Sequence, residues 1–152
     1  MSQAERTDAR SEALADEVIA LQVPDDVAPR PELRAYLFAI VLHETTTEVG
    51  RIALRVDHDD PGLVASAGHV GFEVAPEHRG RRHALRACRL LAPLARRHGF
   101  AELWLMTSPD NAASRRTIEL LGAVYVDTVE IPVHSDMRLL GLTQMRRYRW
   151  ML

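Results

Sequence analysis

The chain has 152 residues, of which 47% are apolar and 26% charged, with a formal charge of −2 and a single cysteine. Its length predicts one globular domain, and its composition and near-zero charge argue against a disordered protein and a dedicated nucleic-acid binder. A membrane-spanning chain is also not expected, since no apolar run approaches roughly 20 residues. Cys88 cannot form an internal disulfide and the charged start MSQAERTDAR lacks the apolar stretch of a secretory signal, so we expect a soluble cytoplasmic protein.

The first half of the chain predicts strands. Residues 1–16 are polar and are expected to form a flexible N-terminal segment, which leaves 17–152 as the domain. Strands are predicted at 17–23, 35–42, 49–56 and 69–75, where β-branched and aromatic residues cluster or apolar and polar residues alternate. The connection 24–34 contains three prolines, so it cannot hold a long helix.

The second half of the chain alternates helices with strands. A helix is predicted at 82–98, where Ala84, Cys88, Leu91 and Ala95 form one apolar stripe. The apolar run 101–107 predicts a central strand, and a second helix is predicted at 111–121, before a terminating glycine. Strands at 123–131 and 144–151 follow, joined by a loop at 132–143. This order predicts a mixed α/β domain with one crossover, between the strands at 69–75 and 101–107.

The segment GFEVAPEHRGRRHA joins a strand to a helix through a basic loop. A helix N-terminus carries unpaired N–H groups and the positive end of the helix dipole, and arginines add charge-assisted hydrogen bonds to phosphate oxygens. The segment therefore predicts a diphosphate bound at the helix start near Arg82. A solvated helix face is the competing interpretation of the nearby arginines, which are Arg79, Arg81, Arg82, Arg86 and Arg89.

Two motifs of this sequence resemble the cofactor elements of the GNAT superfamily of N-acetyltransferases. The family signature is a strand ending V-x-P, followed by Q/R-x-x-G-x-G/A at the helix start. Here Val74-Ala75-Pro76 precedes Arg79-Gly80-Arg81-Arg82-His83-Ala84, with Arg82 at the position of the expected glycine. In DNAASRRTIELLGA, Asn111 opens a helix that Gly122 closes 11 residues later, with Ser114 at the small-residue position. The resemblance covers about residues 35–131.

The resemblance implies a mixed, mostly antiparallel α+β sheet with a strand–helix–strand–helix core that binds acetyl-CoA where the strands at 69–75 and 101–107 splay apart. It also implies direct attack of a primary amine, of unknown identity, on the thioester. Backbone groups of Phe72 and Val74 would pair with the pantetheine arm, and Asn111 and Ser114 would contact its amides. The pyrophosphate would be held by the backbone amides of Arg79, Gly80, Arg81, Arg82, His83 and Ala84.

Two positions depart from the family pattern. Met106 stands where some members carry a glutamate as general base, and Ile118 where many carry a tyrosine as acid toward the leaving thiolate. Glu73 is the best local candidate for a catalytic base, with an ion pair to a nearby arginine as its alternative role. Strand alternation places Glu73 on the face opposite Phe72 and Val74, unless a bulge re-aims the strand.

The acceptor side also departs from the family. Members normally place two helices between the first two strands, whereas residues 24–34 are the whole connection here. This spacing predicts an acceptor site that is open or is completed by a second subunit in a homodimer. The loop 132–143, with His134, Asp136 and Arg138, is the expected other wall.

Two other functions stay open at this stage. One is a non-catalytic acyl-CoA-binding sensor or partner module, suggested by Met106 and Ile118. The other is an RNA- or ribosome-associated protein that uses the arginine cluster; residues 61–152 carry a balance of +5, but the −7 of residues 1–60 argues against it. No metal is predicted, because the seven histidines lack metal-ligand spacing.

Overall fold

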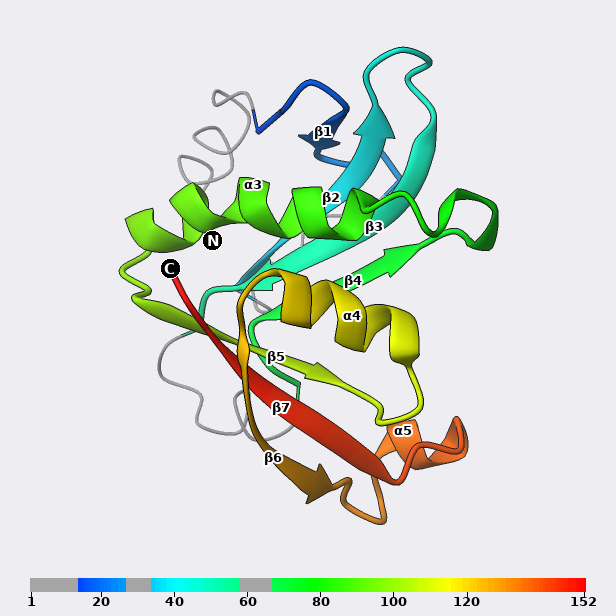
Figure 1. Cartoon of the computed structure of the whole chain (residues 1–152), viewed down its shortest axis with the longest axis vertical. Coiled ribbons are helices and arrows are strands. Elements are labelled where there is room, and N and C mark those ends of the chain that lie inside the picture. The colour runs from blue at the N-terminus through cyan, green and yellow to red at the C-terminus, as the bar shows by residue number, and fades with distance from the viewer. Residues whose placement is uncertain (1–13, 27–33, 58–66) are drawn as a thin grey trace.

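The computed structural model describes residues 14–26, 34–57 and 67–152. These residues form a seven-stranded sheet in the order β1-β2-β3-β4-β5-β7-β6 (Figure 1). Every neighbouring pair is antiparallel except β4 with β5, which confirms the predicted mixed, mostly antiparallel sheet. In chain order the elements are β1 (Ile19–Gln22), β2 (Ala35–Leu42), β3 (Glu48–Arg55), β4 (Val70–Val74), the short 3-10 helix η2 (Pro76–His78), α3 (His83–Arg97), β5 (Glu102–Thr107), α4 (Ala112–Leu120), β6 (Val124–Glu130), α5 (Asp136–Leu139) and β7 (Gln144–Met151).

The predicted elements are present, and two local differences have a physical cause. β1 begins later than predicted because the Asp16 carboxylate accepts the N–H groups of Val18, at 2.7 Å, and Ile19, at 2.9 Å, in a turn. The predicted loop 132–143 contains the short helix α5, which Ser135 caps by accepting the N–H of Met137 at 3.3 Å. Residues 1–13 of the expected flexible segment and residues 27–33 of the first connection lie outside the described residues.

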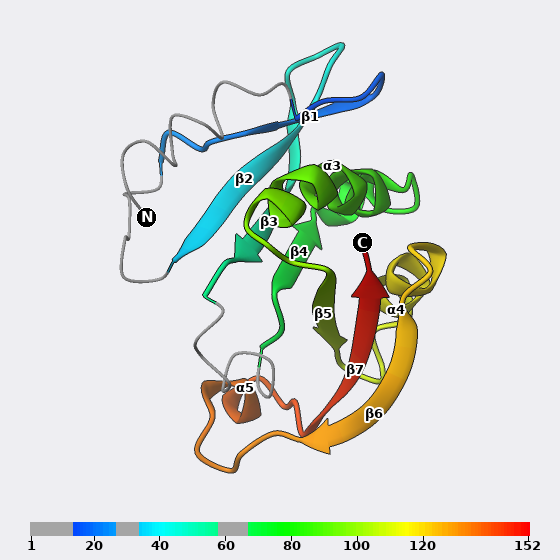
Figure 2. The same cartoon turned by 90° about the vertical axis from the view of Figure 1, so that its left-hand side faces the viewer.

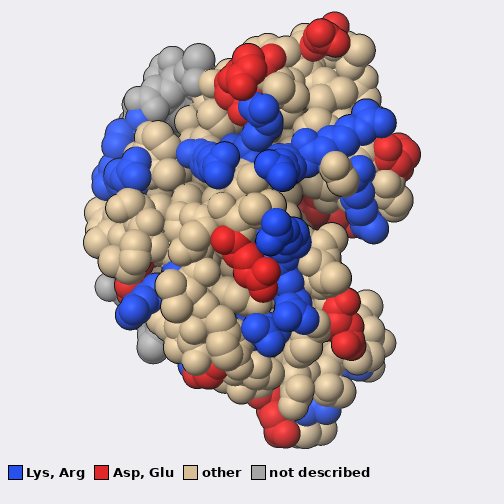
Figure 3. Space-filling view, viewed as in Figure 1, with Lys and Arg blue, Asp and Glu red and all other residues tan. Residues whose placement is uncertain are grey.

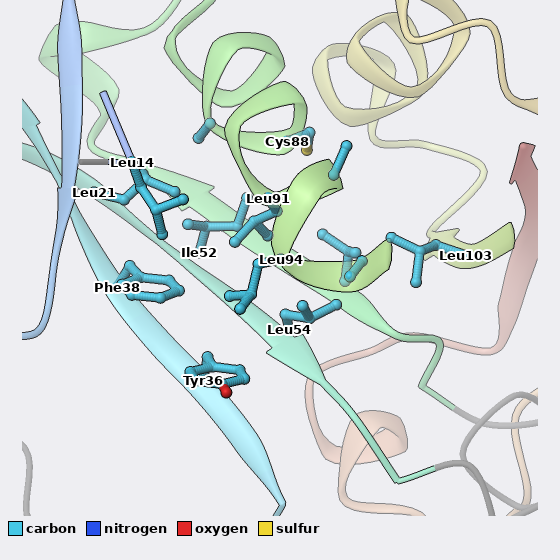
Figure 4. Close-up of a cluster of buried hydrophobic side chains, with 14 of the residues drawn as sticks. Leu14, Leu21, Tyr36, Phe38, Ile52, Leu54, Cys88, Leu91, Leu94 and Leu103 are labelled. Carbon is cyan, nitrogen blue, oxygen red and sulfur yellow. The ribbon is translucent and has the colours of Figure 1, made fainter. Parts of the chain in front are cut away.

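The core lies between α3 and one face of the sheet (Figure 4). Cys88 and Leu91 are fully buried against Phe38, Ile52 and other strand residues, so the predicted helix stripe is confirmed. Burial raises the pKa of the Cys88 thiol to about 12, which keeps it un-ionised near neutral pH. Cys88 therefore acts as a small core residue.

The sheet opens between β4 and β5. These strands pair only at Val70 and Leu105, next to a bond from the His69 N–H to the Trp104 carbonyl at 2.8 Å. Beyond that point the two strands diverge, and α3 and α4 lie beside the opening (Figures 1 and 2). The separation that the resemblance implied is thus present.

The closing half of the molecule uses α4 to cover β5. Ile118 of α4 is 1% exposed and belongs to the same core as Leu103, Leu105 and Tyr148. Among the helices of the described residues, none combines the length and the apolar character needed to cross a bilayer.

Candidate functional site

A cleft of about 410 Å³ lies at the opening of the sheet. Its walls are the end of β4, the loop after it, the first turn of α3 and one side of α4. Figure 3 shows the hollow at the edge of the molecule, below a row of arginines that follows α3 onto the loop. The structure brings together every residue that the sequence analysis proposed for the site: Phe72, Glu73, Val74, Arg79, Gly80, Arg81, Arg82, His83, Ala84, Asn111 and Ser114.

The start of α3 presents a run of unused backbone donors. In the described part of the chain, no hydrogen bond uses the N–H groups of residues 80–85; the first helical bond runs from Arg86 N–H to the Arg82 carbonyl, at 3.1 Å. No side chain caps this helix, and its first turn contains no acidic residue. Six consecutive donors at an uncapped helix N-terminus form a binding site for an anion such as a diphosphate.

Two residues of the loop have left-handed backbone. Gly80 has φ +80° and Arg82 has φ +63° with ψ +23°. Arg82 is the position at which the family signature expects glycine, and the backbone there has the conformation that glycine adopts most easily. The departure in sequence therefore leaves the loop conformation intact, while it places an exposed arginine at the mouth of the cleft.

The arginines of the cluster have different roles. Arg79 donates to the Val74 carbonyl at 2.9 Å and so closes the turn after β4. Arg86 bonds to Asp16 at 3.0 Å and Glu17 at 3.1 Å, which ties the start of the described chain to α3. Arg81 and Arg82 are exposed at the cleft and have no ion-pair partner within the described residues. These two remain available for a ligand.

His83 is buried beside the cleft. The residue is 5% exposed, and neither ring nitrogen has a hydrogen-bond partner among the residues that the structure describes. Burial lowers the pKa of His83, and the nearby charges of Arg81 and Arg86 act in the same direction, so the ring is neutral at pH 7. The sequence analysis proposed only its backbone amide. The signal for its burial was the helical spacing of His83, Ala87, Leu91 and Leu94.

The end of β4 turns backbone groups toward the opening. In an antiparallel pair, every second residue directs its N–H and carbonyl groups toward its partner strand. The β3-facing residues are identified by two bonds of 2.8 Å, from Arg55 N–H to the His69 carbonyl and from Ala75 N–H to the Val49 carbonyl. The same alternation directs the backbone groups of Phe72 and Val74 away from β3, toward the gap.

On the α4 side, Asn111 has a structural task. Its side-chain oxygen accepts the Ser114 N–H at 3.1 Å and caps the helix. This leaves the side-chain NH₂ group of Asn111 to face a ligand. Ile118, by contrast, points into the core and does not line the cleft.

Glu73 is exposed, and its strand contains no bulge. It lies opposite Arg51 in an unshifted β3–β4 register, on the face of the sheet away from Phe72 and Val74. Arg51 bonds instead to Glu48 at 2.6 Å and to Asp26 at 2.9 Å. The described residues provide no ion-pair partner for Glu73, so its carboxylate is available.

Comparisons with solved structures agree with this fold. The ribosomal-protein-S5-alanine acetyltransferase from Vibrio fischeri has a TM-score of 0.62 at 17% identity, and the match covers 80% of this chain but 63% of that protein, less than two thirds of its length. RimL, a ribosomal L7/L12 alpha-N-protein acetyltransferase, has a TM-score of 0.68 at 12% identity and covers 92% and 98% of the two chains. yncA from Salmonella typhimurium, with acetyl-CoA as its cofactor, has a TM-score of 0.59 at 17% identity and covers 81% and 68%.

Sequence comparison identifies the family directly. Curated protein sequences gave no significant match to the chain. The family model for the acetyltransferase (GNAT) domain matches residues 2–124, which is most of the sequence. This chain therefore belongs to the GNAT acetyltransferase family.

Proposed function

We propose that this protein is a CoA-dependent N-acetyltransferase that transfers the acetyl group of acetyl-CoA to a primary amine. The observation that carries the proposal is the run of six unused N–H groups at residues 80–85, at the uncapped start of α3 and beside a cleft of about 410 Å³. That arrangement suits the pyrophosphate of the coenzyme. Arg81 and Arg82 would add charge-assisted bonds, and Asn111 and Ser114 would contact the pantetheine amides.

The reaction needs little covalent chemistry from the protein. The amine lone pair attacks the thioester carbonyl carbon, the C–N bond forms and the C–S bond breaks. The amine nitrogen loses its proton to a general base, and the leaving thiolate takes up a proton from solvent. Backbone N–H groups of Phe72 or Val74 that face the gap would stabilise the developing oxyanion. Positioning of the two substrates supplies much of the remaining acceleration.

Glu73 is the proposed general base. Its carboxylate is exposed and without an ion-pair partner among the described residues, on the face of the sheet opposite α3. General-base catalysis contributes about 10²–10⁴ in rate. Glu73→Gln is therefore expected to lower kcat by at least about tenfold near neutral pH while leaving coenzyme affinity unchanged.

A non-catalytic acyl-CoA sensor is the second candidate. It is favoured by Met106 and by Ile118, whose burial in the core leaves no acid at that position. Coenzyme binding without thiol release from acetyl-CoA, across a broad panel of amines, would support the sensor. A steep salt dependence of RNA binding would instead favour the RNA-associated alternative.

A charge-neutral variant tests the coenzyme site. Arg81→Gln should weaken acetyl-CoA binding by up to about fivefold, because an exposed charge pair contributes at most about 1 kcal/mol. Arg96→Gln, on the last turn of the same helix and away from the cleft, is the matched control. Calorimetry measures both affinities; no binding by the unmodified protein, or equal losses in the two variants, would contradict the proposed site.

The proposal includes expectations for the acceptor, the location and the oligomeric state of the protein. We expect the acceptor to be an amine, and we expect the acceptor side to be open or to be completed by a second copy of the chain. We also expect a soluble protein of the cytoplasm, in which the single cysteine stays reduced. Sedimentation equilibrium distinguishes a monomer from a homodimer.

A further inference from the structure

The face of the sheet opposite α3 carries a half-buried arginine. On β3, Ile52 and Leu54 enter the core, so Arg51, Ala53 and Arg55 lie on the other face. Figure 4 shows the core side of this strand beneath α3. Arg55 is therefore an arginine on the far face of the sheet, one strand away from the opening between β4 and β5.

The guanidinium of Arg55 lies next to a glycine of β4. A Cβ atom on Gly71 would lie 3.7 Å and 3.9 Å from the two terminal nitrogens of Arg55, so the guanidinium lies over this residue. Gly71 is the first residue of β4 after Val70, the last that pairs with β5. The charge of Arg55 therefore lies at the point where the two strands separate.

Toward the described residues, Arg55 uses little of its hydrogen-bonding capacity. Apart from its backbone bond to His69, it makes one bond in the described parts of the chain, from Nη1 to the Gly68 carbonyl at 3.3 Å. No described carboxylate lies within ion-pair distance of it. A guanidinium has five N–H donors in a planar fork that matches a carboxylate or phosphate.

Two other arginines of the sheet, Arg147 and Arg149, differ from Arg55 because each has an acidic partner. Arg147 lies over the Trp104 ring, with 5.5 Å from its central carbon to the ring centroid, but Asp127 holds it through two bonds of 2.6 and 2.5 Å. Arg149 lies 3.6 Å from Glu102. Burial lowers the pKa of Arg55, which marks a partly desolvated charge that no described acid compensates.

We infer that Arg55 binds an anionic group, a carboxylate or a phosphate, that the acceptor carries close to the amine it presents for acetylation. The inference rests on the proposed function, since it places the acceptor at the strand opening, on the face away from α3. A bidentate bond to Arg55 would fix the orientation of the acceptor while its amine reaches the thioester. Arg55 is thus a specificity-determining residue for the acceptor.

Matched amines test the inference and identify the source of the anion. Glycine against glycinamide tests a free carboxylate, phosphoethanolamine against ethanolamine tests a phosphate, and the peptide amides Ser-Glu-Gly and Ser-Gln-Gly test an acidic side chain. Thiol release from acetyl-CoA gives kcat and KM for each amine. At least one anionic member should exceed its neutral partner in kcat/KM by about 10- to 100-fold, as expected for a charge-assisted hydrogen bond.

Three variants separate recognition from structure. Arg55→Gln removes the charge and keeps a polar amide at this position, and it should remove the preference through KM while neutral amines and acetyl-CoA affinity stay unchanged. Arg55→Lys should restore part of the preference. Arg149→Gln removes a charge from the same face and should leave the preference unchanged.

The outcomes distinguish this inference from the proposed function. If no anionic amine is acetylated better than its neutral partner, or if Arg55→Gln lowers both members of a pair equally, the inference is wrong. If the protein binds acetyl-CoA and acetylates neutral amines equally well, the proposed function stands without it. Absence of acetyl-CoA binding by calorimetry overturns the proposed function itself.

Discussion

Arg82 combines an unusual backbone with a charge at the cleft, and the two contributions can be separated. Its φ of +63° is strained for a residue with a Cβ atom. Arg82→Ala keeps that strain and Arg82→Gly relieves it. The free energy of unfolding of the glycine variant should therefore be about 1 kcal/mol higher than that of the alanine variant. Both should weaken acetyl-CoA binding equally, because both lose the guanidinium. Urea unfolding and calorimetry measure the two effects, and a more stable alanine variant would contradict the assigned backbone.

His83 links stability to pH. Its pKa is lowered in the folded state, chiefly by burial, whereas an unfolded histidine titrates near about 6.5. As the pH falls below that value, the unfolded chain takes up a proton that the folded chain does not, so the free energy of unfolding decreases until the lower, folded pKa is reached.

We expect His83→Leu to remove that part of the pH dependence, since the variant has no proton to bind at this position. It should also be more stable than the unmodified protein near pH 6, because two unpartnered ring nitrogens leave the core. His134→Leu, at an exposed position, should retain the pH dependence. Urea unfolding between pH 5 and 8 is the measurement. If the free energy of unfolding of His83→Leu depends on pH in the same way as that of the unmodified protein, the lowered pKa assigned to His83 is refuted.

At the scale of elements, the sequence predicted well where one local pattern dominates. The strand Ala35–Leu42 is as predicted because its β-branched and aromatic residues have no competing signal, and the stripe containing Cys88 defined the buried side of α3. β1 and α5 were missed in detail because a single side chain decides each boundary, the Asp16 carboxylate in one and the Ser135 hydroxyl in the other.

The pairing of β3 with the end of β4 depends on one glycine. A Cβ atom on Gly50 would lie 2.2 Å from the Glu73 carbonyl oxygen, a backbone atom that cannot move alone. Gly50→Ala should therefore displace the strand that carries Phe72 and Val74, lower the free energy of unfolding by about 1–3 kcal/mol and weaken acetyl-CoA binding. Gly71→Ala, which meets only the flexible end of Arg55, should cost less than half as much. Equal stability of the two variants would show that the strand adjusts freely.

At the scale of the whole molecule, the cleft residues were predictable because each belongs to one of two local sequence motifs. One motif joins β4 to α3, and the other opens α4. Strand order then brings the loop after β4 and the start of α4 to the same opening. The Arg86 bonds to Asp16 and Glu17, and the position of Arg55 over Gly71, join residues that are distant in sequence. No local spacing encodes such contacts, so they required the structure.

Occupation of the cleft should stabilise the entire domain. A ligand at about 100 times its Kd adds roughly 2.7 kcal/mol to the free energy of unfolding, which corresponds to about 5–10 °C in Tm for a domain of this size. The neighbouring exposed alanines of α4 provide a matched pair, because Ala113 lines the cleft and Ala112 does not. Ala113→Trp should leave the Tm of the free protein nearly unchanged and abolish the shift caused by acetyl-CoA, whereas Ala112→Trp should preserve it. Calorimetric scans with and without acetyl-CoA decide the matter: a full shift in Ala113→Trp would mean that the coenzyme binds elsewhere on the molecule.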